Sequence, residues 1–137
     1  MSKCPMCEEL PRSSALPLFI ADMGSSVAVL NSNQLFKGRS LVILKKHATE
    51  LYQLSPQERQ QYCEEMIQVA EALDKACHPD KMNYVVHGNI VAHLHWHLIP
   101  RYKDDPYWGS PIDYKPSKKL KNEEYADLIK EIRRHLP

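Results

Sequence analysis

The alternation of apolar and polar residues predicts three strands in the first third of the chain. The stretches 18–22, 25–30 and 39–45 are rich in aliphatic residues, and turn-forming residues separate them. The run L-V-I-L within the third stretch is continuously apolar, which is typical of a central strand covered on both faces. These strands therefore come before any long helix.

A long amphipathic helix follows and begins at Ser55. The residues S-P-Q-E at 55–58 form a capping box with proline at the first helical position. Apolar residues then recur every three or four positions and form one stripe, made of Tyr62, Met66, Val69, Ala70, Leu73 and Ala76. His78-Pro79 is expected to end this helix.

The second half of the chain predicts two more strands and a second helix. The strands cover 82–87 and 93–101, and the helix covers about 122–135. Short connections between successive strands favour antiparallel pairing, so the expected fold class is α+β. A chain of 137 residues has room for a single domain, 1–137.

Composition and charge argue against several classes of protein. Hydrophobic residues make up 43% and charged residues 26% of the chain, as in a soluble globular protein. The net charge of +1, from 18 basic and 17 acidic residues, argues against a nucleic-acid partner or a membrane surface. No apolar run approaches the roughly 20 residues that span a bilayer. The first residues lack the apolar stretch of a signal peptide, so we expect a cytoplasmic protein with reduced thiols.

Three histidines alternate with apolar residues in the run H-L-H-W-H-L-I. In a strand, His93, His95 and His97 share one face, because successive side chains point to opposite faces. Imidazoles titrate near neutral pH and can act as nucleophile, proton donor or metal ligand. An exposed strand face that happens to carry histidines is the alternative. The clustering of such groups favours an active site.

The loop before this run supplies candidate phosphate ligands. Backbone amides at Gly88 and Asn89, together with the Asn89 side chain, suit the oxygens of a phosphate held near His95. A simple hairpin turn would explain the same two residues. A neutral imidazole carries a free lone pair, so His95 can attack phosphorus without a separate base.

Two of the four cysteines have the spacing of a metal site or a redox pair. Cys4 and Cys7 in C-P-M-C supply two thiolates, and two imidazoles would complete a tetrahedral zinc site. A redox dithiol is the alternative, but no thioredoxin-like strand and helix surround the pair. Cys63 and Cys77 fall within the long helix, where we expect small buried residues.

The run H-L-H-W-H-L-I resembles the signature of the histidine triad family. The segment L-V-I-L-K-K-H at 41–47 is similar to the strand and turn of that family, and the resemblance extends from C-P-M-C to about Tyr102. It implies a bacterial-type nucleotide-binding or hydrolase member with a five-stranded antiparallel sheet, one long helix and one C-terminal helix. Residues 1–14 would then be a zinc-binding segment, and 104–137 the C-terminal loop and helix.

The resemblance also implies roles for individual residues. The middle histidine of the triad, His95, would be the nucleophile that forms a nucleotidyl-histidine intermediate, and His97 would contact the phosphate. Asn31 corresponds to a residue that meets the ribose. Gly88 and Asn89 correspond to the phosphate loop.

A metal ion and a partner subunit are implied in the same way. Uridylyltransferase-like members of the superfamily bind a structural zinc ion, and the matching ligands here are Cys4, Cys7, His47 and His93. Magnesium can accompany a polyphosphate substrate. The family also implies a homodimer, whose interface we expect to include the helix from Ser55 and the nearby strands.

The expected function is hydrolysis or nucleotidyl transfer at the α-phosphate of a nucleoside-phosphate-X substrate. Dinucleoside polyphosphates and nucleoside phosphoramidates are the candidates. The alternatives are a nucleotide-binding or partner-binding protein with incidental hydrolysis, and a metallohydrolase that uses the triad as metal ligands.

Two features depart from the family pattern. Arg39 stands where many members have a histidine, and it can meet a phosphate or a carboxylate instead. Tyr107 and Trp108 match no family motif. They would either cover the nucleotide or a partner subunit, or pack the C-terminal loop.

Overall fold

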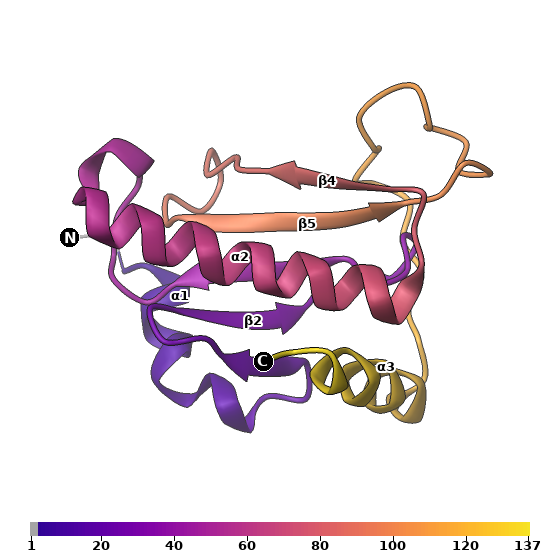
Figure 1. The fold of residues 1–137 in the computed structure, drawn as a ribbon, viewed down its shortest axis with the longest axis horizontal. Helices are drawn as coiled ribbons and strands as arrows, with labels where there is room; N and C mark the ends of the chain where they lie inside the picture. Colours follow the sequence, from indigo (N-terminus) through magenta and orange to yellow (C-terminus); the bar gives the residue numbers. More distant parts are fainter. Residues whose placement is uncertain (1–2) are drawn as a thin grey trace.

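Five strands form one antiparallel sheet in the computed structural model, which describes residues 3–137 (Figure 1). The strands are β1 (Phe19–Asp22), β2 (Ser26–Leu30), β3 (Ser40–Leu44), β4 (Lys81–Val85) and β5 (His95–Arg101). Their spatial order is β1-β2-β3-β5-β4, and every neighbouring pair is antiparallel. The predicted α+β class with a five-stranded sheet is confirmed.

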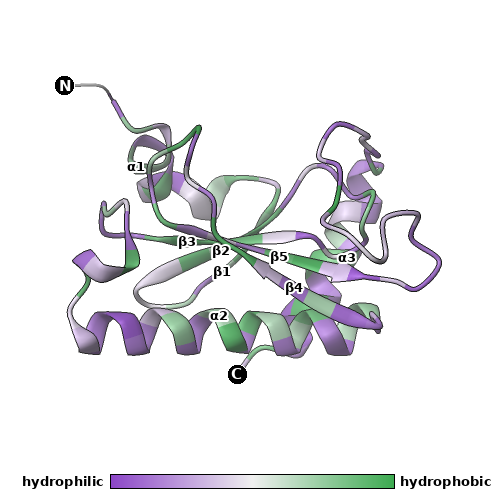
Figure 2. Ribbon diagram, turned by 90° about the horizontal axis from the view of Figure 1, so that it is seen from above, coloured by the Kyte–Doolittle hydropathy of each residue, from purple (hydrophilic) through white to green (hydrophobic). Residues whose placement is uncertain are grey.

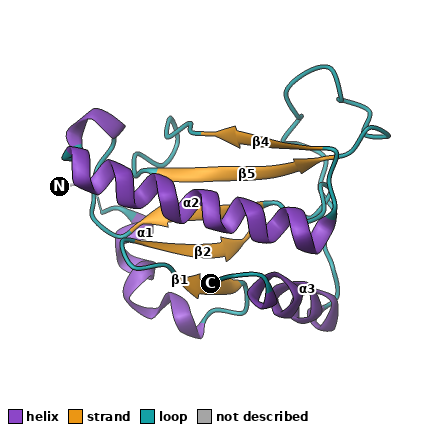
Figure 3. Ribbon diagram, in the orientation of Figure 1, coloured by secondary structure: helices purple, strands orange, loops and turns teal. Residues whose placement is uncertain are grey.

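Within the described residues, three α-helices accompany this sheet (Figure 3). α1 (Pro5–Glu9) continues into a 3-10 turn (Leu10–Ala15), α2 (Pro56–Cys77) connects β3 to β4, and α3 (Asn122–Arg134) packs beside α2 and β1. A short 3-10 turn (Leu51–Gln53) precedes α2. Within residues 3–137 no helix is both long enough and apolar enough to cross a membrane.

α2 begins and ends where the sequence predicts. The Ser55 hydroxyl accepts a hydrogen bond from the backbone amide of Glu58 at 3.1 Å, and the Glu58 carboxylate accepts one from the Ser55 amide at 2.9 Å. At the other end His78 adopts a left-handed conformation with φ 51°, which caps the helix, and Pro79 follows. Local signals therefore fix both ends of the longest helix.

The hydrophobic core lies between α2 and one face of the sheet. Leu94 and Leu98 point to this side, as the alternation predicts, and are 3% and 0% exposed. Tyr62 of α2 donates a hydrogen bond from its hydroxyl to the backbone carbonyl of Val42 on β3 at 2.8 Å. Figure 2 shows α2 on this side of the sheet, with α1 and the loop after β5 on the other. The face opposite α2 carries the histidines.

Two local predictions are wrong. β5 begins at His95 instead of at 93, because the chain bends at His93 and the side chain of His93 meets the N-terminal segment. Cys63 is exposed, whereas Cys77 is buried as expected. Successive helical residues are about 100° apart, so position 63 turns away from the buried stripe that contains Tyr62.

Gly38 offers a test of the close contact between the loop before β3 and the end of α2. Its φ is +94°, and an added Cβ would lie 2.7 Å from Sγ of Cys77 and 3.1 Å from Cγ of Pro100. Gly38→Ala is therefore expected to lower the free energy of unfolding by about 2–4 kcal/mol in a denaturant titration, from backbone strain and crowding together.

Gly109→Ala is the matched control, because no atom lies within 4 Å of its added Cβ. It should change the free energy of unfolding by no more than about 0.5 kcal/mol. Equal stability of the two variants would contradict the close contact at Gly38.

Candidate active site

His95 and His97 lie side by side on the face of β5 that points away from α2. Their ring centroids are 4.8 Å apart, and His95 is 7% exposed. On the neighbouring strand β3, Ile43 stands opposite His95 and Leu41 stands opposite His97. Directly opposed residues share a face of the sheet, so these two apolar side chains flank the histidines.

A backbone hydrogen bond fixes which nitrogen of His95 is available for reaction. Nδ1 of His95 lies 2.6 Å from the backbone carbonyl of His93. A carbonyl can only accept, so Nδ1 carries the proton and donates it. In the neutral ring the lone pair is then on Nε2. Nε2 of His95 therefore has the lone pair that the predicted nucleophile requires.

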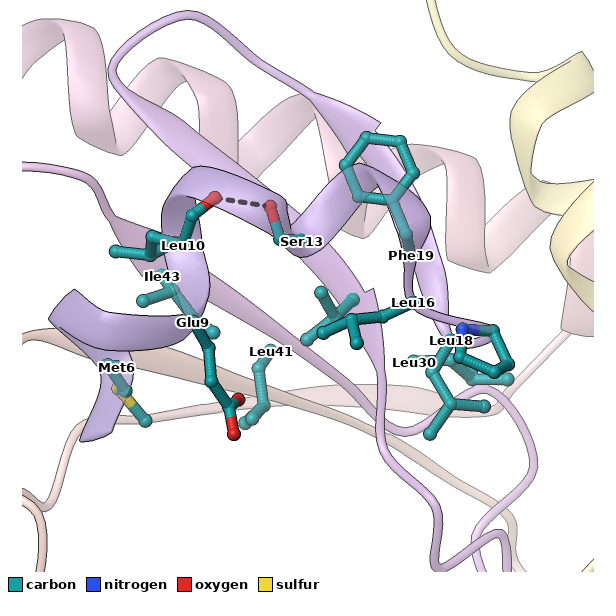
Figure 4. A pocket seen from close by; sticks show the side chains of 12 residues that line it. Met6, Glu9, Leu10, Ser13, Leu16, Leu18, Phe19, Leu30, Leu41 and Ile43 are labelled. Carbon is teal, nitrogen blue, oxygen red and sulfur yellow. Dashed lines mark hydrogen bonds between the residues drawn. The ribbon is translucent and has the colours of Figure 1, made fainter.

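An apolar pocket of about 320 Å³ lies beside β3, and its lining includes neither His95 nor His97 (Figure 4). Leu41 and Ile43, the cross-strand neighbours of the histidines, line it from β3. Side chains from α1, the segment between α1 and β1, β1 and β2 complete the lining, among them Met6, Phe19 and Leu30. Its volume falls at the lower end of the roughly 300–1,000 Å³ typical of small-molecule sites.

His97 is surrounded by other titratable groups. Its ring centroid is 5.7 Å from that of His87, just after β4, and 6.3 Å from that of Tyr114 in the loop after β5. Burial lowers the pKa of His97 to about 4, and the charges of His95, Arg39 and His87 contribute in the same direction. His97 is therefore neutral in the free site at pH 7.

Arg39, for which the sequence suggested contact with a phosphate or a carboxylate, lies in this site, and so does Tyr114, to which the sequence gave no role. The guanidinium carbon of Arg39 lies 4.9 Å from the centroid of the Tyr114 ring, and the Tyr114 hydroxyl is 3.1 Å from Nε2 of His87. Arg39 lies two residues before Leu41, just before β3. In an extended chain the two side chains point to the same face of the sheet, and this spacing was the sequence signal available for placing Arg39 on the histidine face. Tyr114 lies in an irregular loop, where no periodicity indicates a direction.

Four side chains from distant parts of the chain form a second cluster, made of Cys4, Cys7, His47 and His93. One ligand atom of each lies within 4.8 Å of the others. The two Nδ1 atoms are 3.2 Å apart, and Sγ of Cys7 is 3.3 Å from Nδ1 of His47 and 3.4 Å from Nδ1 of His93. Tetrahedral zinc with ordinary bond lengths separates its ligand atoms by roughly 3.3–3.8 Å. The cluster can hold a metal ion, as the family resemblance implied.

The surroundings of these ligands support the same conclusion. Nε2 of His93 donates a hydrogen bond to the carbonyl of Leu44 at 2.6 Å, which leaves the lone pair on Nδ1 facing the thiols. Burial raises the pKa of the Cys7 thiol, and the neighbouring Cys4 raises it further. A bound cation would oppose both effects on the thiol.

The triad is thereby divided between two sites. Among residues 3–137, the group with metal-ligand spacing includes His93 but neither His95 nor His97. Nδ1 of His95 donates to a carbonyl, and that ring faces the sheet surface beside the pocket. This division argues against a metallohydrolase in which all three histidines bind one catalytic metal.

The remaining predicted residues lie around the site with fewer contacts. Asn31 follows β2, and its side chain accepts a hydrogen bond from the Asn33 amide at 2.9 Å. Gly88 has a φ of +86°, as a tight turn requires, while Asn89 is exposed and its side chain has no hydrogen bond within the described part of the chain. The roles of Asn31, Gly88 and Asn89 stay predictions.

The two aromatic residues of the C-terminal loop differ from each other. Tyr107 packs against a small buried cluster with Phe36, Ile99 and Ile112. Trp108 is 41% exposed and lines a groove beside β4. Packing therefore accounts for Tyr107, and Tyr114 is the loop residue that reaches the triad.

A five-stranded antiparallel sheet with alternating histidines beside an apolar pocket defines a histidine triad protein. The HIT domain family matches residues 17–104, and the chain belongs to this family. It is 32% identical to adenylylsulfatase HINT3 of Arabidopsis thaliana, over 97% of this chain and 69% of that protein. It is 28% identical to adenosine 5′-monophosphoramidase hnt1 of Schizosaccharomyces pombe, over 82% of this chain and 84% of that protein.

The fold is also similar to solved structures of this family. A histidine triad protein of Sinorhizobium meliloti matches with a TM-score of 0.80 and 25% sequence identity, covering 99% of both chains. Relatives named as hydrolases and this shared fold support a hydrolase at the level of the family.

The low pKa of His97 predicts a specific dependence on pH. The folded-state value of about 4 lies below the ordinary value of about 6.5 in an unfolded chain, so the unfolded state binds more protons between the two. The stability that the neutral ring contributes is present above about pH 6.5 and is lost as the pH falls toward 4. NMR titration of the His97 ring should show a midpoint near 4, and His97→Asn should make the loss of stability shallower. A midpoint near 6.5 would contradict the buried environment.

Proposed function

We propose that the chain is a nucleotide hydrolase or nucleotidyl transferase that acts at the α-phosphorus of a nucleoside 5′-phosphate-X substrate. The observation that carries this proposal is the position of His95. Its Nδ1–H is donated to the His93 carbonyl, its Nε2 is free to attack, and its cross-strand neighbour Ile43 lines an apolar pocket of about 320 Å³.

The pocket suits the nucleoside part of such a substrate. Aliphatic and aromatic side chains such as Leu41 and Phe19 offer apolar surface for a base, and Asn31 follows the pocket residue Leu30 directly. We assign Asn31 to the ribose. The α-phosphate then lies over His95 and His97, with the backbone amides of Gly88 and Asn89 as further donors.

The reaction proceeds in two displacements. Nε2 of His95 attacks the α-phosphorus, a nitrogen–phosphorus bond forms, and the bond to X breaks with its electron pair leaving on X. Water then attacks the same phosphorus, the nitrogen–phosphorus bond breaks, and the nucleoside monophosphate departs while His95 regains its lone pair. His97 contacts the phosphate oxygens throughout. Splitting one difficult displacement into two is the advantage of a covalent intermediate.

The names of two relatives support this reaction class. Adenylylsulfatase and adenosine 5′-monophosphoramidase are both hydrolytic activities on adenylyl compounds. Dinucleoside polyphosphates and nucleoside phosphoramidates are the substrate classes we propose for this chain. Magnesium would be present only when it is bound to a polyphosphate substrate.

We propose zinc as the ion of the four-ligand cluster. Two thiolates and two imidazoles at tetrahedral spacing are the ligands that structural zinc prefers, and no ligand position is left open for a substrate. Such an ion crosslinks the segment around Cys4 and Cys7 to the sheet and takes no part in the displacement. Its ligands must be reduced thiols, which supports a cytoplasmic location.

We also propose a homodimer. β4 is an edge strand of the sheet, and Tyr84 on it and Ile67 on α2 are 49% and 48% exposed. An exposed strand edge with apolar neighbours favours pairing with a second copy. The interface expected from the sequence, α2 with the nearby strands, includes both residues.

His95→Asn is expected to reduce turnover at least about 10³-fold while nucleotide binding persists, because the variant keeps the pocket and loses the nucleophile. Single-turnover reactions with α-³²P-labelled substrate, quenched in alkali, should trap labelled wild-type protein and no labelled variant. His135→Asn, the same substitution near the end of α3, should leave turnover unchanged. Retained turnover in His95→Asn, or a wild-type protein that binds nucleotide without labelling, would contradict the mechanism.

Cys4→Ser is expected to remove the zinc and destabilise the protein, because binding of structural zinc contributes on the order of 10 kcal/mol to folding. Elemental analysis should find zinc stoichiometric with the wild-type chain and nearly absent from the variant, whose thermal midpoint should fall. Cys63→Ser is the matched control, since that thiol is exposed on α2 and far from the cluster in sequence. Zinc retained in Cys4→Ser but lost in His95→Asn would instead favour a catalytic metal at the triad.

A further inference from the structure

Arg39 is a buried cation without an anionic partner. The residue is 6% exposed, its Nε is buried without a hydrogen bond, and within residues 3–137 its guanidinium forms no ion pair. Arg101 provides the contrast, because it is 2% exposed and is fully occupied by the carboxylate of Asp105, the side chain of Asn83 and two backbone carbonyls.

The two buried arginines therefore differ in how their positive charge is balanced. Burying a charge without a counter-ion is unfavourable, so buried guanidinium groups are normally paired, as Arg101 is. Burial lowers the pKa of Arg39, yet an arginine keeps its charge at neutral pH. The ring of Tyr114, 4.9 Å from the guanidinium carbon, is the partner that the structure shows. A cation–π contact satisfies none of the N–H donors.

Strand register places Arg39 next to the reacting groups. Leu41 stands opposite His97, and Arg39 is two residues earlier, so it lies on the same face about 6.6 Å further along the strand. The positive charge of Arg39 is also among the causes that lower the pKa of His97, after burial and the charge of His95. The order along this face is His95, His97 and then Arg39.

We propose that Arg39 binds a negatively charged leaving group, so that the site prefers nucleoside 5′-phosphates joined to an oxyanion, such as sulfate or phosphate, over those joined to an amine. This inference rests on the proposed function, because it requires His95 to attack the α-phosphorus. With the α-phosphate over His95 and His97, a group attached to it on the side of Arg39 meets the guanidinium.

The charge balance of the reaction explains the preference. When Nε2 of His95 attacks, the bond from phosphorus to the bridging oxygen breaks and its electron pair stays on that oxygen. A sulfate leaves as the dianion and needs no proton, and a guanidinium stabilises the developing charge with paired N–H donors. An amine must gain a proton to depart, and a guanidinium gives up its proton too reluctantly to supply one.

Tyr114 positions the guanidinium without touching the reacting atoms. Its ring faces Arg39, and its hydroxyl lies 3.1 Å from Nε2 of His87. The loop after β5 thereby connects Arg39 to the end of β4. An anion that enters this cluster meets Arg39, His87 and His97, and no carboxylate among the described residues pairs with Arg39.

The test compares two adenylate substrates that differ in the charge of the leaving group, adenosine 5′-phosphosulfate and adenosine 5′-phosphoramidate. Arg39→Met, which keeps the length and removes the charge, should lower kcat/KM for the phosphosulfate by about 10²-fold, the effect of losing one oxyanion ligand. The same variant should change kcat/KM for the phosphoramidate by less than about threefold. Lys37→Gln removes an exposed positive charge from the same loop and should leave both values unchanged.

Wild-type protein tests the inference independently of any variant. Its kcat/KM should be higher for the phosphosulfate than for the phosphoramidate. Equal decreases of kcat/KM on both substrates in Arg39→Met would overturn the assignment, because Arg39 would then bind the α-phosphate that both substrates share. A wild-type preference for the phosphoramidate would overturn it as well, because Arg39 would then not favour an anionic leaving group.

Sulfate binding separates failure of this inference from failure of the proposed function. Inorganic sulfate should raise the thermal midpoint of the wild-type protein and compete with the phosphosulfate, and Arg39→Met should lose the shift in midpoint. If neither adenylate is turned over, the proposed function fails, while the sulfate-dependent shift still decides whether Arg39 binds an oxyanion. An identical shift in wild type and Arg39→Met would overturn the inference.

Discussion

Three hydrogen-bonding groups of His93 connect the four-ligand cluster, the sheet and His95. Its Nδ1 faces the thiols of the N-terminal segment, its Nε2–H donates to the Leu44 carbonyl on β3, and its own carbonyl accepts from Nδ1 of His95. The first contact depends on the second, because the hydrogen bond at Nε2 determines which nitrogen keeps a lone pair. The third determines the tautomer of His95. One residue thus holds the N-terminal segment on the sheet and determines which nitrogen of His95 keeps its lone pair.

One face of the sheet packs against α2 and the other carries the candidate site. The two-residue period of a strand separates the side chains of the two faces. Val42 and Leu44 of β3 are buried in the core under α2, while Leu41 and Ile43 of the same strand line the pocket. β5 repeats the division, with Leu98 on the core side and His97 on the other. A shift of one residue in the register would bury the histidines and expose the core. The packing of α2 against the sheet therefore also determines the position of the site.

Local patterns in the sequence predicted most of this fold, and contacts between distant residues account for what they missed. The capping box at Ser55 and the left-handed cap at His78 are local, so the ends of α2 were predictable. The start of β5 was not, because His93 leaves the strand to meet cysteines 86 and 89 residues away. The cluster of Cys4 with His93 was expected only through the family resemblance. No local signal indicates that Tyr114 crosses to Arg39.

The positive charge of Arg39 beside His97 in the free site favours binding of an anion between them. Arg39 is charged, while burial, together with the charge of Arg39, lowers the pKa of His97 and keeps it neutral. An oxyanion bound between them would offset the repulsion from Arg39 and favour the protonated form of His97, because an opposite charge nearby stabilises a charged group. By linkage, protonation of His97 would in turn strengthen binding of the anion. A neutral substrate group in the same place would leave His97 uncharged. The site would therefore gain a second positive charge, on His97, only when an anionic ligand binds.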